Sequence, residues 1–171
     1  KNIKHRTNQT EAPKNVVNVT DRMAHLQKGL RLPVAPKHIE CFDNSNFQGT
    51  NAVAACVVFK NGLPASSEYR HFNIKTVIGP DDFASMKEIV HRRYKRVLDE
   101  NRSLPDLIVI DGGKGQLSAA LEALEILNLR GKVPVIGLAK KLEEVFFPGD
   151  TYPILLDRNN PGLLLLQHIR N

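Results

Sequence analysis

The chain has 171 residues, of which 42% are hydrophobic and 25% are charged. This balance is typical of a globular protein, and the length suits one domain that folds without disulfides or a structural metal. We expect a cytoplasmic protein, because the sequence has neither a run of roughly 20 apolar residues that could span a bilayer nor an N-terminal secretory signal. The net charge of +6 favours polyanionic partners, since Lys and Arg that neutralise phosphates release counterions.

Residues 1–37 are polar and basic and contain one amphipathic stretch. Its helical signals are an N-cap pair, three apolar residues at helical spacing and two closing prolines: Thr20-Asp21; Met23, Leu26 and Leu30; Pro33 and Pro36. We therefore predict a linker with a short helix over 1–37 and a folded domain over 38–171.

Three strand-like runs open this domain, at 38–43, 52–59 and 68–77. The second is almost continuously apolar, as in a strand buried on both faces, whereas the third alternates between apolar and polar residues. Asn61-Gly62 is a hairpin-type turn signal between them. Together the three runs predict an antiparallel meander.

The two cysteines, Cys41 and Cys56, lie within the first two of these runs. Neither is part of a close pair with metal-ligand spacing. We expect both to be buried free thiols.

A helix is predicted over 81–98, opened by Asp81 and Asp82. N-capping and the helix dipole explain both acids, and we favour this role over a further site carboxylate. The outer face of the helix carries five basic residues: His91, Arg92, Arg93, Lys95 and Arg96. Two interpretations stay open for this face. It contacts phosphates, or it is a solvated surface whose charge is balanced by acids of the same helix.

The second half of the chain alternates between strand and helix. A β-branched run over 107–111 ends at Gly112-Gly113 and leads into a helix over 117–127, and another strand follows over 133–138. This order of elements requires parallel pairing of the two strands. A small hairpin and a final helix complete the predicted elements, at 145–156 and 161–171.

Asp43 and Asp111 each stand at the end of a predicted strand. If the first strand is central and pairs in parallel with the strand that ends at Asp111, both carboxylates lie at the carboxyl edge of the sheet, where open α/β sheets place their sites. Neighbouring strands are about 4.8 Å apart, so that two carboxylates can reach one cation. Hard oxygen ligands select Mg²⁺ or Mn²⁺. The alternative is that both residues simply form Asx-turns.

Lys114 lies in a glycine-rich loop where the amino end of a helix can meet phosphate. The loop lacks the Ser or Thr that follows Lys in a Walker motif, and Ser118 stands where the dinucleotide-binding pattern requires its third Gly. As a nucleotide-binding signal the loop is therefore weak.

Several separate motifs occur in order along the chain. They are Ile39-Glu40-Cys41-Phe42-Asp43-Asn44-Ser45, the run 69–75, Gly79-Pro80-Asp81-Asp82, Asp111-Gly112-Gly113-Lys114-Gly115-Gln116, the run 136–140 and Leu166-Gln167-His168-Ile169-Arg170. In these motifs the sequence resembles the C-terminal endonuclease domain of the UvrC family, the nucleases of the bacterial excinuclease ABC system. The resemblance covers nearly everything from Leu30 onward.

The resemblance implies an RNase H-like α/β fold, with a mixed sheet and flanking helices, and an Asp-Asp-His active site that incises DNA on the 5′ side of a lesion. The two family aspartates fall on Asp43 and Asp111, with Mg²⁺ or Mn²⁺ as the cofactor. A further acidic position falls on Asp82, without an assigned role, and Lys114 lies in the family's phosphate-loop position. The implied partners are damaged DNA and the excinuclease component UvrB, which other parts of the full-length protein contact.

One departure concerns the third catalytic residue. The family's His follows the Leu-Gln-x-Ile-Arg motif, and this chain stops at Asn171. His168 is not its equivalent. We therefore expect a fragment that is inactive or a very weak nuclease by itself.

Three hypotheses follow. The first is a metal-dependent DNA endonuclease domain that uses Asp43 and Asp111, with Lys114, Arg92, Arg93 and Arg96 as phosphate contacts. The second is a noncatalytic DNA-binding or protein-docking module of the same fold. A nucleotide-binding protein ranks last, because the loop at Lys114 matches neither standard phosphate pattern.

Overall fold

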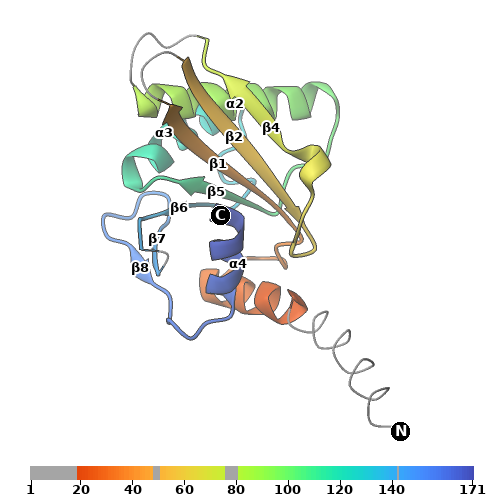
Figure 1. Ribbon diagram of the computed structural model, residues 1–171, viewed down its shortest axis with the longest axis vertical. Helices are drawn as coiled ribbons and strands as arrows, with labels where there is room; N and C mark the ends of the chain where they lie inside the picture. Colours follow the sequence, from red (N-terminus) through yellow and green to blue (C-terminus); the bar gives the residue numbers. More distant parts are fainter. Residues whose placement is uncertain (1–18, 48–50, 76–80, 142) are drawn as a thin grey trace, which may run out of the picture.

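One mixed sheet organises the structure, a computed structural model that describes residues 19–47, 51–75, 81–141 and 143–171 (Figure 1). Its strand order is β3-β2-β1-β5-β6-β7-β8, and β4 also pairs with β2. The strands are β1 His38–Phe47, β2 Asn51–Lys60, β3 Leu63–Pro64, β4 Arg70–Asn73, β5 Leu107–Asp111, β6 Val135–Leu138, β7 Glu144–Phe146 and β8 Ile154–Leu155. The helices are one over 19–30, η1 Ser66–Glu68, α2 Asp82–Asp99, α3 Lys114–Ile126 and α4 Gly162–Arg170.

The predicted topology is confirmed at the centre of the sheet. Strand β1 pairs antiparallel with β2 and parallel with β5, and β5 pairs parallel with β6. The predicted terminal hairpin is present as the antiparallel pair β7 and β8. The parts of the predictions that fall on 1–18, 48–50 and 76–80 lie outside the described residues.

The third predicted strand, 68–77, is shorter in the structure. Residues 66–68 form η1, and β4 ends at Asn73. Soon after, the backbone N–H of Lys75 donates to both carboxylate oxygens of Glu88, at 3.0 and 3.1 Å. An acceptor from α2 thus replaces a strand partner and ends the ladder.

Two apolar cores cover the two faces of the sheet. Alternate side chains of a strand point to opposite faces. Accordingly, Ile108 and Ile110 pack in the core beneath α2 and α3, whereas Leu107 and Val109 pack in the core beneath α4 and the helix over 19–30. The result is a three-layer α/β/α arrangement.

The helix over 19–30 is an integral part of the second core. The sequence pattern places it in a linker, but Leu26 and Leu30 are 0% and 2% exposed and belong to the same core as Ile39 and Leu107. The amphipathic stripe that predicts the helix also explains this packing, because such a face must be buried against something. In the described part of the chain, no helix is long and apolar enough to cross a membrane.

The two thiols lie on opposite faces of the sheet. Cys41 belongs to the second core and Cys56 to the first, and both are buried and free of disulfides. The prediction of buried free thiols is confirmed.

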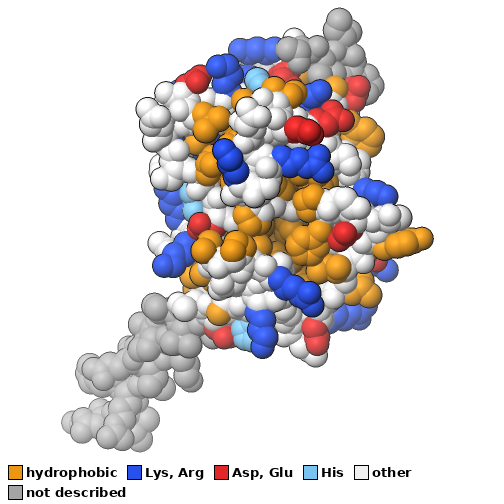
Figure 2. Space-filling view, turned by 180° about the vertical axis from the view of Figure 1, so that it is seen from behind, with side chains coloured by type: hydrophobic (Ala, Val, Ile, Leu, Met, Phe, Trp, Pro, Cys, Tyr) orange, Lys and Arg blue, Asp and Glu red, His pale blue; other side chains and the backbone are white. Residues whose placement is uncertain are grey.

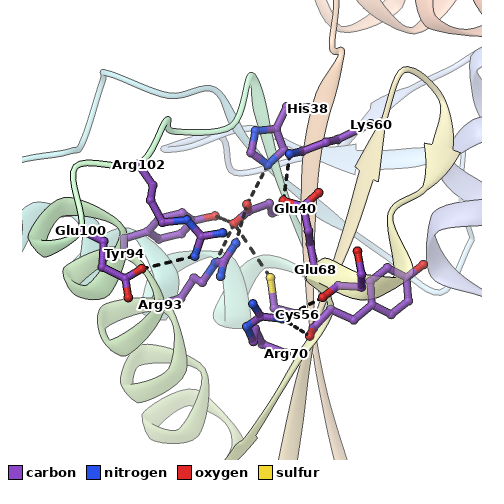
Figure 3. A network of polar contacts seen from close by, with 12 residues as sticks. His38, Glu40, Cys56, Lys60, Glu68, Arg70, Arg93, Tyr94, Glu100 and Arg102 are labelled. Atoms are coloured by element: carbon purple, nitrogen blue, oxygen red, sulfur yellow. Dashed lines mark hydrogen bonds and ion pairs between the residues drawn. The ribbon is translucent and has the colours of Figure 1, made fainter.

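A buried ionic cluster ties β1 to α2 (Figure 3). Glu40, 1% exposed, accepts hydrogen bonds from Arg93 at 2.9 and 3.1 Å and from the hydroxyl of Tyr94 at 3.0 Å. His38 Nε2 lies 2.8 Å from the same carboxylate. Burial alone would raise the pKa of Glu40, but the hydrogen bonds from His38 and Arg93 lower it to about 2.

We predict that Glu40→Gln lowers the free energy of unfolding by about 3 kcal/mol, because it leaves the Arg93 guanidinium buried without a counter-charge. The measurement is chemical denaturation at neutral pH. Glu68→Gln, which removes the surface pair with Lys60, is the control and should cost less than about 1 kcal/mol. Equal costs for the two variants would contradict this role for Glu40.

The same cluster makes the free energy of unfolding depend on pH. The folded pKa of about 2 lies below the ordinary value of 4.5, so the unfolded chain binds more protons between these values. The contribution of Glu40 is therefore complete above about pH 4.5 and is lost as the pH falls toward about 2.

Candidate active site

Asp43 and Asp111 lie side by side at the carboxyl edge of the sheet. In the parallel pairing of β1 with β5, the two residues are direct partners in the register. Their side chains share a face because each follows its strand's alternation, after Cys41 in β1 and after Val109 in β5. Strands about 4.8 Å apart therefore present two carboxylates to the same space.

The electrostatic environment disfavours two negative charges here. Partial burial raises the pKa of Asp43, and the charge of Asp111 raises it further. Burial likewise raises the pKa of Asp111, although the positive charge of Arg170 opposes this shift. Each carboxylate would be stabilised by a cation between them.

Arg170 is a component of the site that sequence reasoning missed. It lies at the end of α4, and its Nε is 3.2 Å from Asp111 Oδ1 in an ion pair that lacks hydrogen-bond geometry. Its terminal nitrogens donate to the carbonyls of Ala139 and Lys140, at 2.6 and 3.0 Å. The sequence does indicate that Arg170 lies close to the buried side of α4, because it follows the apolar residues of that helix. It does not indicate that α4 ends beside Asp111, because this depends on the path of the preceding loop.

Cys41 lies beneath the carboxylates. Its side chain is 3% exposed and belongs to the second core. Burial raises the pKa of the Cys41 thiol well above its ordinary range, and the charges of Asp111 and Asp43 add to this shift. The thiol is therefore neutral, and it forms an apolar base under the pair.

The donor set fits a hard divalent cation that keeps part of its water shell. Within 19–47, 51–75, 81–141 and 143–171, no three His, Cys, Asp or Glu side chains come together as metal ligands. Two carboxylates are nevertheless enough for Mg²⁺, which commonly uses one or two of them together with waters and substrate phosphates. Asp43 and Asp111 are the residues that would hold such an ion.

The loop after β5 places Lys114 near this edge. The N–H groups of Gly112 and Gly113 both donate to the carbonyl of Leu138, at 3.2 and 3.1 Å, which fixes the loop to β6. Gly113, with φ of 21°, precedes the first residue of α3, Lys114. The Lys114 side chain is exposed, and its Nζ lies 3.5 Å from the carbonyl of Thr151. This ammonium faces no carboxylate at hydrogen-bond distance among the described residues.

The three arginines predicted as phosphate contacts lie in different environments. Arg93 is 5% exposed and bonded to Glu40, so its guanidinium is occupied inside the fold and does not face a ligand. Arg92 contacts Glu88 and the ring of Phe72 and is partly exposed. Arg96 is exposed and pairs with Glu100. On the face shown in Figure 2, Lys and Arg are scattered and form no single patch.

The two acids that open α2 have separate roles. Asp81 is the N-cap, and its side chain accepts from the N–H of Ala84 at 3.0 Å, as predicted. Asp82 is exposed in the first turn of α2. The structure does not bring Asp82 into a three-ligand group with Asp43 and Asp111 in the described part of the chain.

A mixed sheet with helices on both faces and a central parallel pair is the arrangement of RNase H-like domains. The sequence profile described as "UvrC RNAse H endonuclease domain" matches residues 27–171, and the chain belongs to this family.

Curated relatives support this assignment. The chain is 67% identical to UvrABC system protein C of Flavobacterium johnsoniae over 87% of its own length and 25% of the relative. It is 58% identical to the Porphyromonas gingivalis protein and 50% identical to that of Dehalococcoides mccartyi, in each case over 91% of the chain and 26% of the relative. The chain thus spans about a quarter of the length of these relatives.

Solved structures with a related arrangement include endonuclease V. The protein from Ciona intestinalis, in complex with DNA that contains inosine, matches with a TM-score of 0.46 and 17% identity, over 75% of this chain and 58% of that chain. The catalytic domain of human endonuclease V matches with a TM-score of 0.41 and 19% identity, over 75% and 59%.

We predict that Asp43→Asn stabilises the metal-free protein at pH 7. The pKa of Asp43 is higher in the folded state than in the unfolded chain, so the unfolded chain loses this proton at lower pH. The free energy of unfolding therefore falls as the pH rises from the unfolded pKa through the folded pKa. Because water still reaches the Asp43 carboxylate and screens its charge, the gain should not exceed about 1 kcal/mol. The measurement is the free energy of unfolding from chemical denaturation in a buffer that contains a metal chelator.

The gain should disappear below about pH 3, where the carboxyl is protonated in both states. Asp81→Asn is the control, because Asn preserves the N-cap and should change little. A loss of stability in Asp43→Asn at neutral pH would refute the electrostatic description of the pair.

Proposed function

We propose that this domain hydrolyses a DNA phosphodiester with Mg²⁺ or Mn²⁺ held by Asp43 and Asp111, and that it makes the incision 5′ to a lesion in nucleotide excision repair. The observation that carries the proposal is the direct register of the two carboxylates on one face of the sheet edge. Membership in the UvrC endonuclease domain family supports the reaction and the substrate.

The chemistry that a bound divalent ion supplies is activation of water and stabilisation of charge on the leaving oxygen. Asp43 and Asp111 would hold the ion at the sheet edge. Their positions are fixed, because β1 and β5 each pair with a neighbouring strand on both sides. Lys114 binds a non-bridging phosphate oxygen through its exposed ammonium. Asp82 has no assigned role in this scheme.

The partner of the domain is damaged DNA. Lys114, Arg92 and Arg96 contact its backbone, and Arg93 supports the helix from inside the fold through Glu40. UvrB is the partner of the full-length protein, contacted through parts outside this chain, and the compartment is the cytoplasm. The name UvrABC system protein C, carried by the relatives, supports the assignment of both partners.

We predict that the chain binds Mn²⁺ and that Asp43→Ala or Asp111→Ala weakens this binding about tenfold or more, because each removes half of the protein ligands. The measurement is titration followed by the EPR signal of free Mn²⁺. Asp82→Ala is the matched acidic control and should bind as the wild type does. Equal affinity in wild type and Asp43→Ala would remove the proposed site.

We predict that Lys114→Gln weakens DNA binding and lowers the slope of log affinity against log salt by about 1, as expected for one lost phosphate contact. Binding is followed by fluorescence anisotropy over a range of salt concentrations. Arg130→Gln is the control of equal charge, because Arg130 follows the carboxyl end of α3, at the opposite end of the helix from Lys114, and is paired with Glu125. Identical slopes for Lys114→Gln and the wild type would exclude the contact.

A second candidate is a noncatalytic DNA-binding or docking module of the same fold. It is favoured by the lack of a third His or acidic ligand beside Asp43 and Asp111 in the described residues. For the same reason the chain by itself should nick DNA weakly or not at all. The Mn²⁺ titration separates the two candidates, since the noncatalytic module predicts no carboxylate-dependent binding.

A further inference from the structure

Arg170 occupies an unusual position for a cation, directly beside a proposed metal ligand. Its side chain is 19% exposed and Asp111 is 22% exposed, so water screens the ion pair only in part. The guanidinium stays in place without Asp111, because the carbonyls of Ala139 and Lys140 hold it at 2.6 and 3.0 Å. Two neutral acceptors thus anchor a positive charge at the edge where a second cation would bind.

Of the three contacts of the Arg170 guanidinium, the one with Asp111 is the least well aligned. Nε lies 3.2 Å from Oδ1 without hydrogen-bond alignment, and this buried nitrogen has no other partner. If Asp111 turns toward another cation, the two carbonyls still hold Arg170 in place. The positive charge would then face a divalent ion across the same carboxylate, and that repulsion opposes binding.

A groove beside Arg170 is suited to an anionic ligand, which would bring compensating negative charge. It has a volume of about 600 Å³, lies along α4, and is lined by the cationic residues Lys140, Lys141, Arg158 and Arg170 together with Glu143 and Gln167. Glu143 is engaged by Arg158 at 3.5 Å. The remaining cations make the groove suited to a phosphodiester, whose negative charge can meet Arg170, the residue that also pairs with Asp111.

We propose that Arg170 is a resident counter-ion of the carboxylate pair, which keeps divalent-ion affinity low until a DNA phosphate enters the groove. The inference rests on the proposed metal site and deepens it. Arg170 is a positioning residue in this scheme. It balances Asp111 in the metal-free protein, and it would bind phosphate when Asp111 holds a divalent ion. Metal and DNA binding thereby become mutually dependent, because each brings charge that the other requires.

The test is Mn²⁺ titration of the 171-residue chain, followed by EPR without DNA. Arg170→Gln should bind Mn²⁺ about fivefold to tenfold more tightly than the wild type, the effect expected for loss of one nearby charge at a partly screened site. Arg158→Gln removes the same charge from an exposed position in the same groove and should change affinity less than about twofold. Unchanged or weaker binding in Arg170→Gln overturns the proposal, as does equal tightening in Arg158→Gln.

A second measurement uses the wild type and does not depend on whether the variant folds. Addition of a short single-stranded oligodeoxynucleotide should raise Mn²⁺ affinity, with Asp43→Ala as the background for Mn²⁺ bound to DNA itself. The increase should be smaller in Arg170→Gln. No increase in the wild type overturns the inference and leaves the metal site intact, whereas absence of any Asp43-dependent Mn²⁺ binding overturns the proposed function as well.

Discussion

The parallel pairing of β1 with β5 is the constraint on which the rest of the structure depends. It places Asp43 opposite Asp111, and because parallel neighbours require a crossover connection, it also sets α2 over one face of the sheet. The same pairing sends alternate residues of both strands into two separate cores. A slip of one residue would turn both sets to the wrong faces and separate the carboxylates.

Two acids on the same strand show how position decides between structural and chemical roles. Glu40 points toward α2, where Arg93, Tyr94 and His38 satisfy it and its pKa is about 2. Asp43, three residues later, points to the other face at the open edge, where burial and Asp111 raise its pKa. The charge of the first carboxylate is balanced inside the fold by Arg93. The second keeps a charge that Arg170 offsets only in part and that an added cation or proton would balance.

Sequence patterns predicted what local rules determine. Hydrophobic periodicity predicted the strands, the helices and the parallel unit that ends at Asp111, and strand-end logic paired it with Asp43. Patterns gave the wrong environment for a residue whose partner lies far away in the sequence. Arg93 was predicted on the outer face of its helix, but it is buried against Glu40, which is 53 residues away. Similarly, β4 is shorter than predicted, because the N–H of Lys75 donates to Glu88 on α2. The helix over 19–30 belongs to the second core, because together with α4 it covers one face of the sheet.

The residue that balances charge at the sheet edge, Arg170, also connects α4 to the sheet. Arg170 joins three elements, since it belongs to α4, donates to the two residues that follow β6, and meets Asp111 at the end of β5. A shift of α4 relative to the sheet must therefore change either the carbonyl contacts or the charge beside Asp111. The carbonyl contacts are the better aligned, so Arg170 fixes the end of α4 to the residues that follow β6. Arg170 thus links α4, which Leu165, Leu166 and Ile169 already pack into the second core, to the charge beside Asp111.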